Sequence, residues 1–113
     1  MKRKKFVSYE DGLQERLKDI EYAAAYLNAH LEDENLDERV DDKIEAFLLA
    51  LRDVAIAQGI GKISKHSQLG RESLYKTLSK SGNPKISTLA ALLNAMGLKM
   101  SIETKNIRKS KVS

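Results

Sequence analysis

Apolar residues recur with a helical period along most of this chain. Leu13 and Leu17 indicate a short helix over residues 12–18. Asp19 fits the N-cap of a second helix, because its carboxylate can accept a hydrogen bond from a free backbone N–H. The apolar stripe of that helix runs from Ile20 to Leu31, and polar residues 32–35 then interrupt the pattern.

The longest periodic segment follows this interruption. Asp37 is placed to cap it, and Gly59 provides a residue that tolerates the backbone geometry of a helix end. Its apolar stripe consists of Val40, Ile44, Phe47, Leu48, Leu51, Val54 and Ala55. Shorter helices are predicted over residues 61–67, 71–79 and 86–96, whereas residues 98–104 alternate as in a strand. We expect an all-α protein of five or six helices with one short C-terminal β-strand.

Charge divides the chain into two halves. The 113 residues carry a net charge of +4, but residues 6–58 hold 14 acidic and 5 basic side chains. Residues 59–113 hold 11 basic side chains and two acidic ones. This asymmetry suggests two surfaces with different partners, and a basic half favours nucleic acid, since phosphate contacts release counterions. Two merely solvated charged faces are the alternative.

We divide the chain into a basic arm (1–8), an N-terminal helical extension (9–35), a DNA-binding domain (36–105) and a basic tail (106–113).

Several classes of function lack the residues they need. The sequence has no cysteine, and its two histidines, His30 and His66, lie far apart, so neither a zinc site nor a catalytic triad is indicated. No segment approaches the roughly 18 apolar residues of a membrane span, and no apolar stretch of a signal peptide follows the basic residues 2–5. We expect a cytoplasmic protein without membrane association, enzymatic activity, metal or cofactor.

Residues 59–79 have the pattern of a helix-turn-helix. Ile63, Leu69, Leu74 and Leu78 are the apolar anchors, and Ser64 is the small residue where the helices cross. The outward face of the second helix would meet base edges in the major groove, where arginine can bind guanine with two hydrogen bonds. The candidate base contacts are Arg71, Glu72, Ser73 and Lys76. The candidate phosphate contacts are Lys62, Tyr75, Lys80, Asn83, Lys85 and Thr88.

Residues 68–79, QLGRESLYKTLS, followed by Gly82-Asn83-Pro84, resemble the Cro and phage-repressor helix-turn-helix class, also called the XRE family. Residues 19–28, DIEYAAAYLN, resemble the HigA-like addiction module antidote proteins, and the similarity spans about residues 9–103. The resemblance implies a lambda-repressor-like domain in an antitoxin that binds its own promoter at a palindromic operator. It also implies a small basic toxin of the RelE/ParE superfamily as partner. The sequence departs from the family pattern at three positions: Ser64, Gln68 and Gly70 stand where Ala, Gly and a capping Ser or Thr are usual.

Several interpretations stay open. A carboxylate-rich surface can attract a basic toxin, but it can equally stabilise helix N-termini and aid solubility. The candidate toxin-facing residues are Tyr22, Tyr26, Glu32, Asp33 and Glu34. The strand at 98–104 needs a partner, and the same strand of a second subunit would form a homodimer, although the N-terminal helices offer a competing interface. The rival functions are a stand-alone phage-type regulator and a protein-interaction module that has lost DNA binding.

Overall fold

The computed structural model describes residues 12–32 and 39–104. Residues 12–16 are helical, and Asp19 caps α2 (Ile20–Leu31) as the sequence predicts. The Asp19 carboxylate accepts hydrogen bonds from the backbone N–H groups of Glu21, at 2.9 Å, and Tyr22, at 3.5 Å. These bonds satisfy donors that have no partner within the helix, so a local sequence signal fixes where α2 begins.

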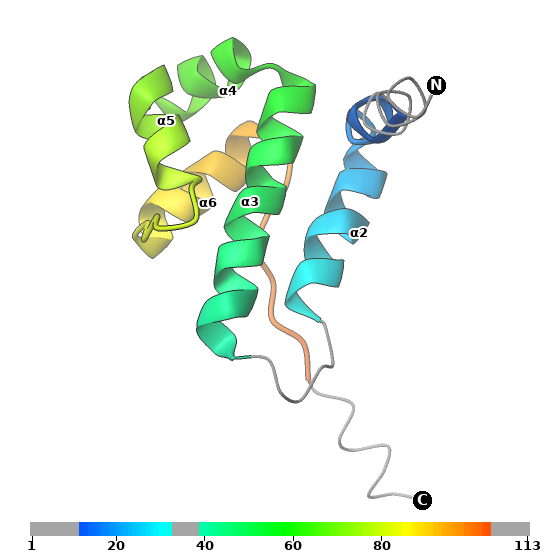
Figure 1. Ribbon diagram of the computed structural model, residues 1–113. Coiled ribbons are helices and arrows are strands. Elements are labelled where there is room, and N and C mark those ends of the chain that lie inside the picture. The colour runs from blue at the N-terminus through cyan, green and yellow to red at the C-terminus, as the bar shows by residue number, and fades with distance from the viewer. Residues whose placement is uncertain (1–11, 33–38, 105–113) are drawn as a thin grey trace, which may run out of the picture.

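The longest helix, α3 (Val40–Gln58), runs antiparallel to α2 and packs against it (Figure 1). The predicted cap, Asp37, lies outside the described residues, and the structure gives Arg39 as the N-cap of α3, with no side-chain capping bond. Asp41 and Asp42 lie in the first turn, where carboxylates stabilise the positive end of the helix dipole. Among the described residues, the charge of the first turn is therefore the feature that stabilises this end of the helix.

Three short helices lie on the side of α3 that is opposite to α2 (Figure 1). They are α4 (Ile60–Ser67), α5 (Arg71–Thr77) and α6 (Ile86–Ala95), close to the predicted ranges. Gly59 joins α3 to α4 with a φ of 108°, a conformation that side chains disfavour. Because only one residue separates the two helices, α4 turns away sharply from the axis of α3, and it packs against α3, α5 and α6.

One continuous apolar core connects both sides of α3. Leu51, Val54 and Ala55 of α3 are fully buried, whereas Val40 and Ile44 at the start of the predicted stripe are 72% and 43% exposed. The stripe is therefore used only where other helices cover it. The remaining fully buried side chains come from both halves of the chain: Leu17, Ala23, Ile63, Leu74, Leu78 and Leu92.

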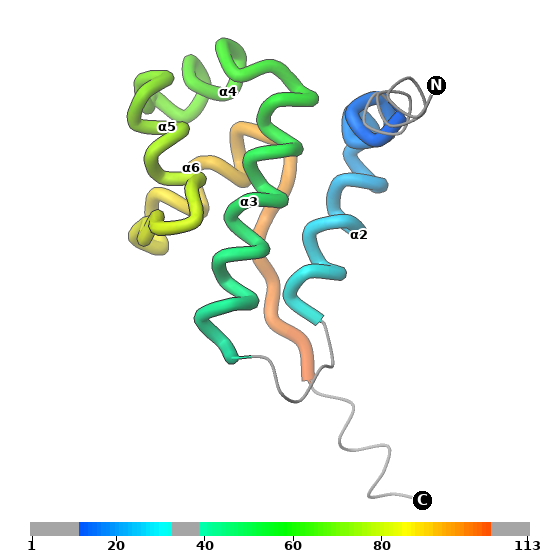
Figure 2. The backbone as a smooth tube through the Cα atoms, in the orientation of Figure 1, coloured from blue at the N-terminus to red at the C-terminus, as the bar shows by residue number. Residues whose placement is uncertain are grey.

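The predicted strand at 98–104 does not form in this chain. Gly97 ends α6 with a φ of 84°, and the N–H of Leu98 donates to the carbonyl of Leu93 at 2.8 Å. Beyond this bond the segment runs extended, without a helix or strand, up to residue 104 (Figure 2). A strand requires backbone hydrogen bonds to a neighbour, and the residues that the structure describes provide none for positions 99–104.

Candidate nucleic-acid interface

A three-residue turn, Gln68-Leu69-Gly70, joins α4 to α5. The Ser64 hydroxyl donates to the carbonyl of Leu69, and the Leu69 N–H donates to the Ser67 hydroxyl at 3.4 Å. Ser64 therefore ties the end of α4 to the turn with a hydrogen bond that alanine could not make. Serine in place of the usual alanine therefore adds a polar contact and does not leave a gap at this position.

The other two departures concern the backbone. Gln68 has a φ of 65° and a ψ of 20°, the left-handed conformation that glycine adopts at little cost. It is the one non-glycine residue with positive φ among residues 12–32 and 39–104. Gly70 is the N-cap of α5 and makes no side-chain capping bond, as the sequence predicts. A Cβ at Gly70 would meet nothing within 4 Å, so this end of α5 has open space.

The four candidate base contacts lie exposed on α5 or at its start. Leu74 is fully buried on the opposite face, which fixes the rotation of the helix, and the exposed residues are Arg71, Glu72, Ser73 and Lys76. The Arg71 guanidinium lies close to α4, because a Cβ built on Gly61 would be 3.0 Å from Arg71 Nη2. Gly61 thus leaves room for the arginine, a relationship that the sequence analysis missed because nothing in the sequence links the two positions.

The candidate phosphate contacts surround α5. Five of them are exposed, namely Lys62, Tyr75, Lys80, Asn83 and Lys85, and Thr88 is half-buried. The loop that carries Lys80 and Asn83 turns tightly at Gly82, whose N–H donates to the carbonyl of Ser79 at 2.9 Å. A Cβ at Gly82 would lie 2.0 Å from the carbonyl oxygen of Thr77, so only glycine fits there. This close approach sets the path of the loop beside α5.

The basic side chains between residues 60 and 85 form no salt bridges with the described part of the chain. Between α4 and the start of α6, six basic side chains and the single acid Glu72 are all exposed. Within the described part of the chain, none of the six makes a salt bridge: Lys62, Lys65, Arg71, Lys76, Lys80 and Lys85. Lys65 was missed in the sequence analysis, although it lies one helical turn after Lys62. Unpaired cations on two adjacent short helices and the following loop make a surface suited to a polyanion.

The two tyrosines of α2, both candidate toxin contacts, differ in whether they pack within the fold or lie exposed at the surface. The Tyr26 hydroxyl donates to Asp53 Oδ2 of α3 at 2.9 Å, and its ring meets His30 edge-on with 4.8 Å between centroids. Tyr26 therefore fastens α2 to α3. Tyr22 is exposed, with the guanidinium of Arg16 above its ring and Arg16 Nε donating to its hydroxyl at 3.3 Å. Glu32 is exposed at the end of α2, whereas Asp33 and Glu34 lie outside the described residues.

Comparison with known proteins identifies the family. The sequence model of one family, described as "probable addiction module antidote protein", matches residues 9–104. The chain belongs to this family. An uncharacterised protein of Haemophilus influenzae is 32% identical over 100 residues, an alignment that covers 80% of this chain and 95% of that protein. No solved structure matches.

The family match extends over both charged halves of the antidote protein. It includes α2 and α3 of the acidic half as well as the turn and α5 of the basic half. An antidote neutralises a toxin, so membership in the family implies a toxin partner. Within the described ranges, no helix is long and apolar enough to cross a membrane.

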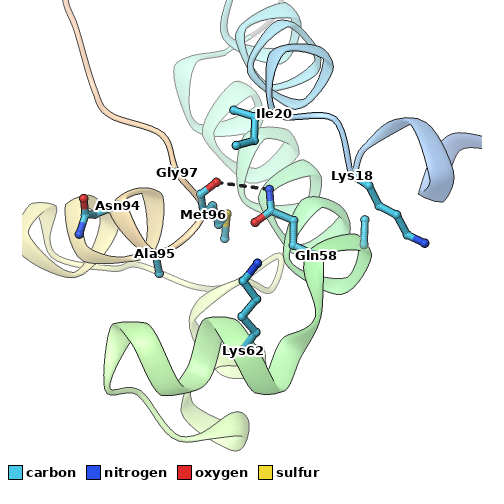
Figure 3. Close-up of a pocket in the computed structure, with 9 residues that line it drawn as sticks. Lys18, Ile20, Gln58, Lys62, Asn94, Ala95, Met96 and Gly97 are labelled. Atoms are coloured by element: carbon cyan, nitrogen blue, oxygen red, sulfur yellow. Dashed lines mark hydrogen bonds between the residues drawn. The ribbon is translucent and has the colours of Figure 1, made fainter.

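A cavity of about 510 Å³ lies where the ends of α3 and α6 meet the starts of α2 and α4 (Figure 3). Gln58 Nε2 donates across it to the carbonyl of Met96 at 3.3 Å, which joins α3 to the end of α6. Lys18 and Lys62 line the cavity together with apolar side chains, and none of the lining residues is acidic. Nor do three histidine or carboxylate groups come together as a metal site anywhere in 12–32 or 39–104.

Proposed function

We propose that this antidote protein is a sequence-specific DNA-binding antitoxin that represses its own promoter and neutralises a RelE/ParE-like toxin, without enzymatic activity. In this proposal α4, the turn and α5 form a lambda-repressor-like helix-turn-helix, and a homodimer binds a palindromic operator. The observation that carries the proposal is the set of six exposed, unpaired cations on and around two helices joined by a three-residue turn.

Base recognition is assigned to the exposed start of α5. The residues near the start of a recognition helix are those that reach base edges in the major groove. Arg71 suits guanine, for which a two-bond contact discriminates by about 1–3 kcal/mol. Glu72 can accept from cytosine N4, and Ser73 and Lys76 complete the exposed set. Leu74, buried below them, prevents the helix from rotating these groups away.

Phosphate binding is assigned to the residues around α5. Lys62 precedes the turn, and Lys80, Asn83 and Lys85 follow α5, so the contacts would flank the recognition helix on both sides. Tyr75 offers a hydroxyl between them, and its side chain is 43% exposed. Such contacts fix the position of a helix in the groove but do not themselves read the sequence.

The test is fluorescence anisotropy with a duplex of the protein's own promoter and a scrambled duplex of equal length, at several salt concentrations. Lys80→Ala should weaken binding to both duplexes alike and reduce the salt slope by about 1. Arg71→Ala should cost about 1–3 kcal/mol on the promoter and relax the preference at one position. The matched control is Arg39→Ala, an exposed cation in the acidic half whose salt bridge to Asp41, at 3.6 Å, is exposed.

Two outcomes would contradict this assignment. Equal effects of Arg39→Ala and Lys80→Ala would mean that binding follows net charge alone. Absence of any duplex binding by the unaltered protein would favour the protein-interaction module.

Neutralisation of the toxin is assigned to the acidic half. Glu21, Asp41 and Asp42 are exposed on α2 and α3, and an RNA-binding toxin must present positive charge. Tyr22 is the exposed aromatic residue on the same helical pair, whereas Tyr26 is engaged with Asp53. Charge complementarity of this kind acts mainly on the rate of association.

This part is tested with the product of the adjacent reading frame. The double variant Asp41→Lys, Asp42→Lys should slow its association by tenfold or more at low salt, with a smaller difference at high salt. The control Lys80→Glu places a charge reversal on the DNA-binding side and should leave the association rate nearly unchanged. A protein that binds its promoter but no toxin would be a stand-alone regulator, in which the acidic half only supports the fold.

A further inference from the structure

Within the described residues, the extended segment 98–104 makes one backbone hydrogen bond, from Leu98 to Leu93, and none beyond it. Leu98 is half-buried and packs against the core, so the segment is anchored at its start. Residues 99–104 are all exposed, and Ile102 is 98% exposed. Within the described part of the chain, their backbone groups make no hydrogen bonds. An extended segment of this kind is a template for strand pairing, because its donors and acceptors need a partner.

The side chains of the segment alternate in character. By strand alternation, Leu98, Met100 and Ile102 share one face, and Lys99 and Glu103 share the other. Only Leu98 packs against the core, since Met100 is 45% and Ile102 is 98% exposed. In an antiparallel pair, residues directly opposite each other lie on the same face. The pairing register therefore decides which charges and which apolar groups meet.

We propose that this segment pairs with the same segment of a second copy of the chain, antiparallel and centred on Ser101. The two-fold axis then passes between the two copies of Ser101. Lys99 of each copy lies opposite Glu103 of the other, which makes two cross-strand ion pairs on the outer face. Met100 lies opposite Ile102 of the other copy, so these two exposed apolar side chains meet on the face opposite to the ion pairs.

Neighbouring registers lose these contacts. A shift of the centre to residue 102 places Lys99 opposite Lys105, a like-charge pair. A shift to residue 100 places Lys99 opposite Ser101 and leaves Glu103 opposite Gly97. A one-residue slip between the strands mixes the two faces, so that Lys99 meets Ile102. The sequence of the segment is thus self-complementary about Ser101, and the occupant that fits it is a second copy of the chain.

This inference names the interface of the homodimer in the proposed function. It also places the dimer interface and the candidate base contacts on different segments of the fold. The pairing segment leaves α6 after Gly97, whereas the candidate base contacts lie on α5. A dimer built through residues 98–104 therefore consumes none of the candidate base contacts, and both copies of α5 stay available for DNA.

The register can be tested directly because the chain contains no cysteine. Ser101→Cys in the full-length protein places the two sulfurs across the axis, where the Cα atoms of opposite residues are about 4.5–5.5 Å apart, within disulfide range. Mild oxidation with diamide should give a covalent dimer at low micromolar concentration. The control is Thr104→Cys, an exposed residue that takes part in neither the ion pairs nor the contact between Met100 and Ile102. Its two copies would be separated by about 20 Å along the strands, too far for a disulfide.

Charge reversal supplies the second measurement. Lys99→Glu and Glu103→Lys should each raise the dimer dissociation constant about tenfold in sedimentation equilibrium, because each turns two attractive pairs into repulsive ones. The double variant Lys99→Glu, Glu103→Lys should restore the original value. Equal cross-linking at positions 101 and 104, a monomer at all concentrations, or a dimer unaffected by either single charge variant would overturn the inference. Titration with promoter DNA is a separate readout, so failure of this interface is distinguishable from failure of DNA binding.

Discussion

Gln68 is the position at which a single substitution should make this protein more stable. It holds a left-handed backbone conformation, with a φ of 65° and a ψ of 20°, in the turn between α4 and α5. A residue with a Cβ pays about 1–2 kcal/mol for this conformation, because the Cβ approaches the following carbonyl oxygen. The side chain of Gln68 is exposed and makes no hydrogen bond within the described residues, so nothing visible compensates for that cost.

Gln68→Gly should remove most of this strain. Glycine also gains freedom in the unfolded chain, which costs about 0.4–1 kcal/mol, so the expected net gain in the free energy of unfolding is about 0.5–1 kcal/mol. For a domain of this size, 1 kcal/mol corresponds to about 4–8 °C in melting temperature. Urea denaturation followed by far-ultraviolet circular dichroism measures the difference, and an unchanged m-value shows that the unfolded state is comparable.

Gln68→Ala is the matched control. It removes the polar side chain but keeps the Cβ, so it should leave the stability within about 0.5 kcal/mol of the unaltered protein. If the glycine variant is no more stable than the alanine variant, the backbone at position 68 carries no strain. The turn would then owe its shape to the other contacts of the segment, such as the bond from Ser64 to Leu69.

Three further substitutions should destabilise the protein, and thermal and urea denaturation measure each of them. Gly82→Ala would place a Cβ 2.0 Å from the carbonyl oxygen of Thr77, so the free energy of unfolding should fall by more than about 2 kcal/mol. Unchanged stability would contradict this close approach. Ser64→Ala should cost about 1 kcal/mol by leaving the Leu69 carbonyl without its donor, and a gain would show that the family's usual alanine packs better. Leu51→Ala should cost about 2.7–5 kcal/mol, since this side chain is fully buried in the core. A loss below about 1 kcal/mol would mean that the surrounding side chains fill the space left by the truncation.

The division of charge follows the division of the fold. Among the described residues, α2 and α3 carry five acidic and two basic side chains, whereas α4, α5 and the loop before α6 carry six basic side chains and one acidic one. Along most of its length α2 lies on one side of α3, and the three short helices lie on the other side (Figure 1). In the proposed function, the toxin and the DNA duplex would therefore contact different side chains of one chain.

Local signals in the sequence located most of the helices. The cap at Asp19, the end of α3 at Gly59 and the buried anchors Leu74 and Leu78 follow from spacing and residue type, and the structure confirms them. Each depends on residues within a turn or two of one another, so the information lies in a short stretch of chain. The exposure of the candidate base contacts follows as well, because it is set by the anchors on the opposite face of α5.

Other features were decided by contacts between distant residues. The bond from Tyr26 to Asp53 joins positions 27 residues apart, and it assigns to the fold a tyrosine that the sequence leaves open as a partner contact. The approach of Arg71 to Gly61 depends on the angle at which α4 meets α5. Segment 98–104 has the sequence of a strand, but no other described segment forms backbone hydrogen bonds with residues 99–104. Periodicity and caps are properties of one segment, whereas burial and pairing are properties of two, and only the tertiary structure specifies which two segments meet.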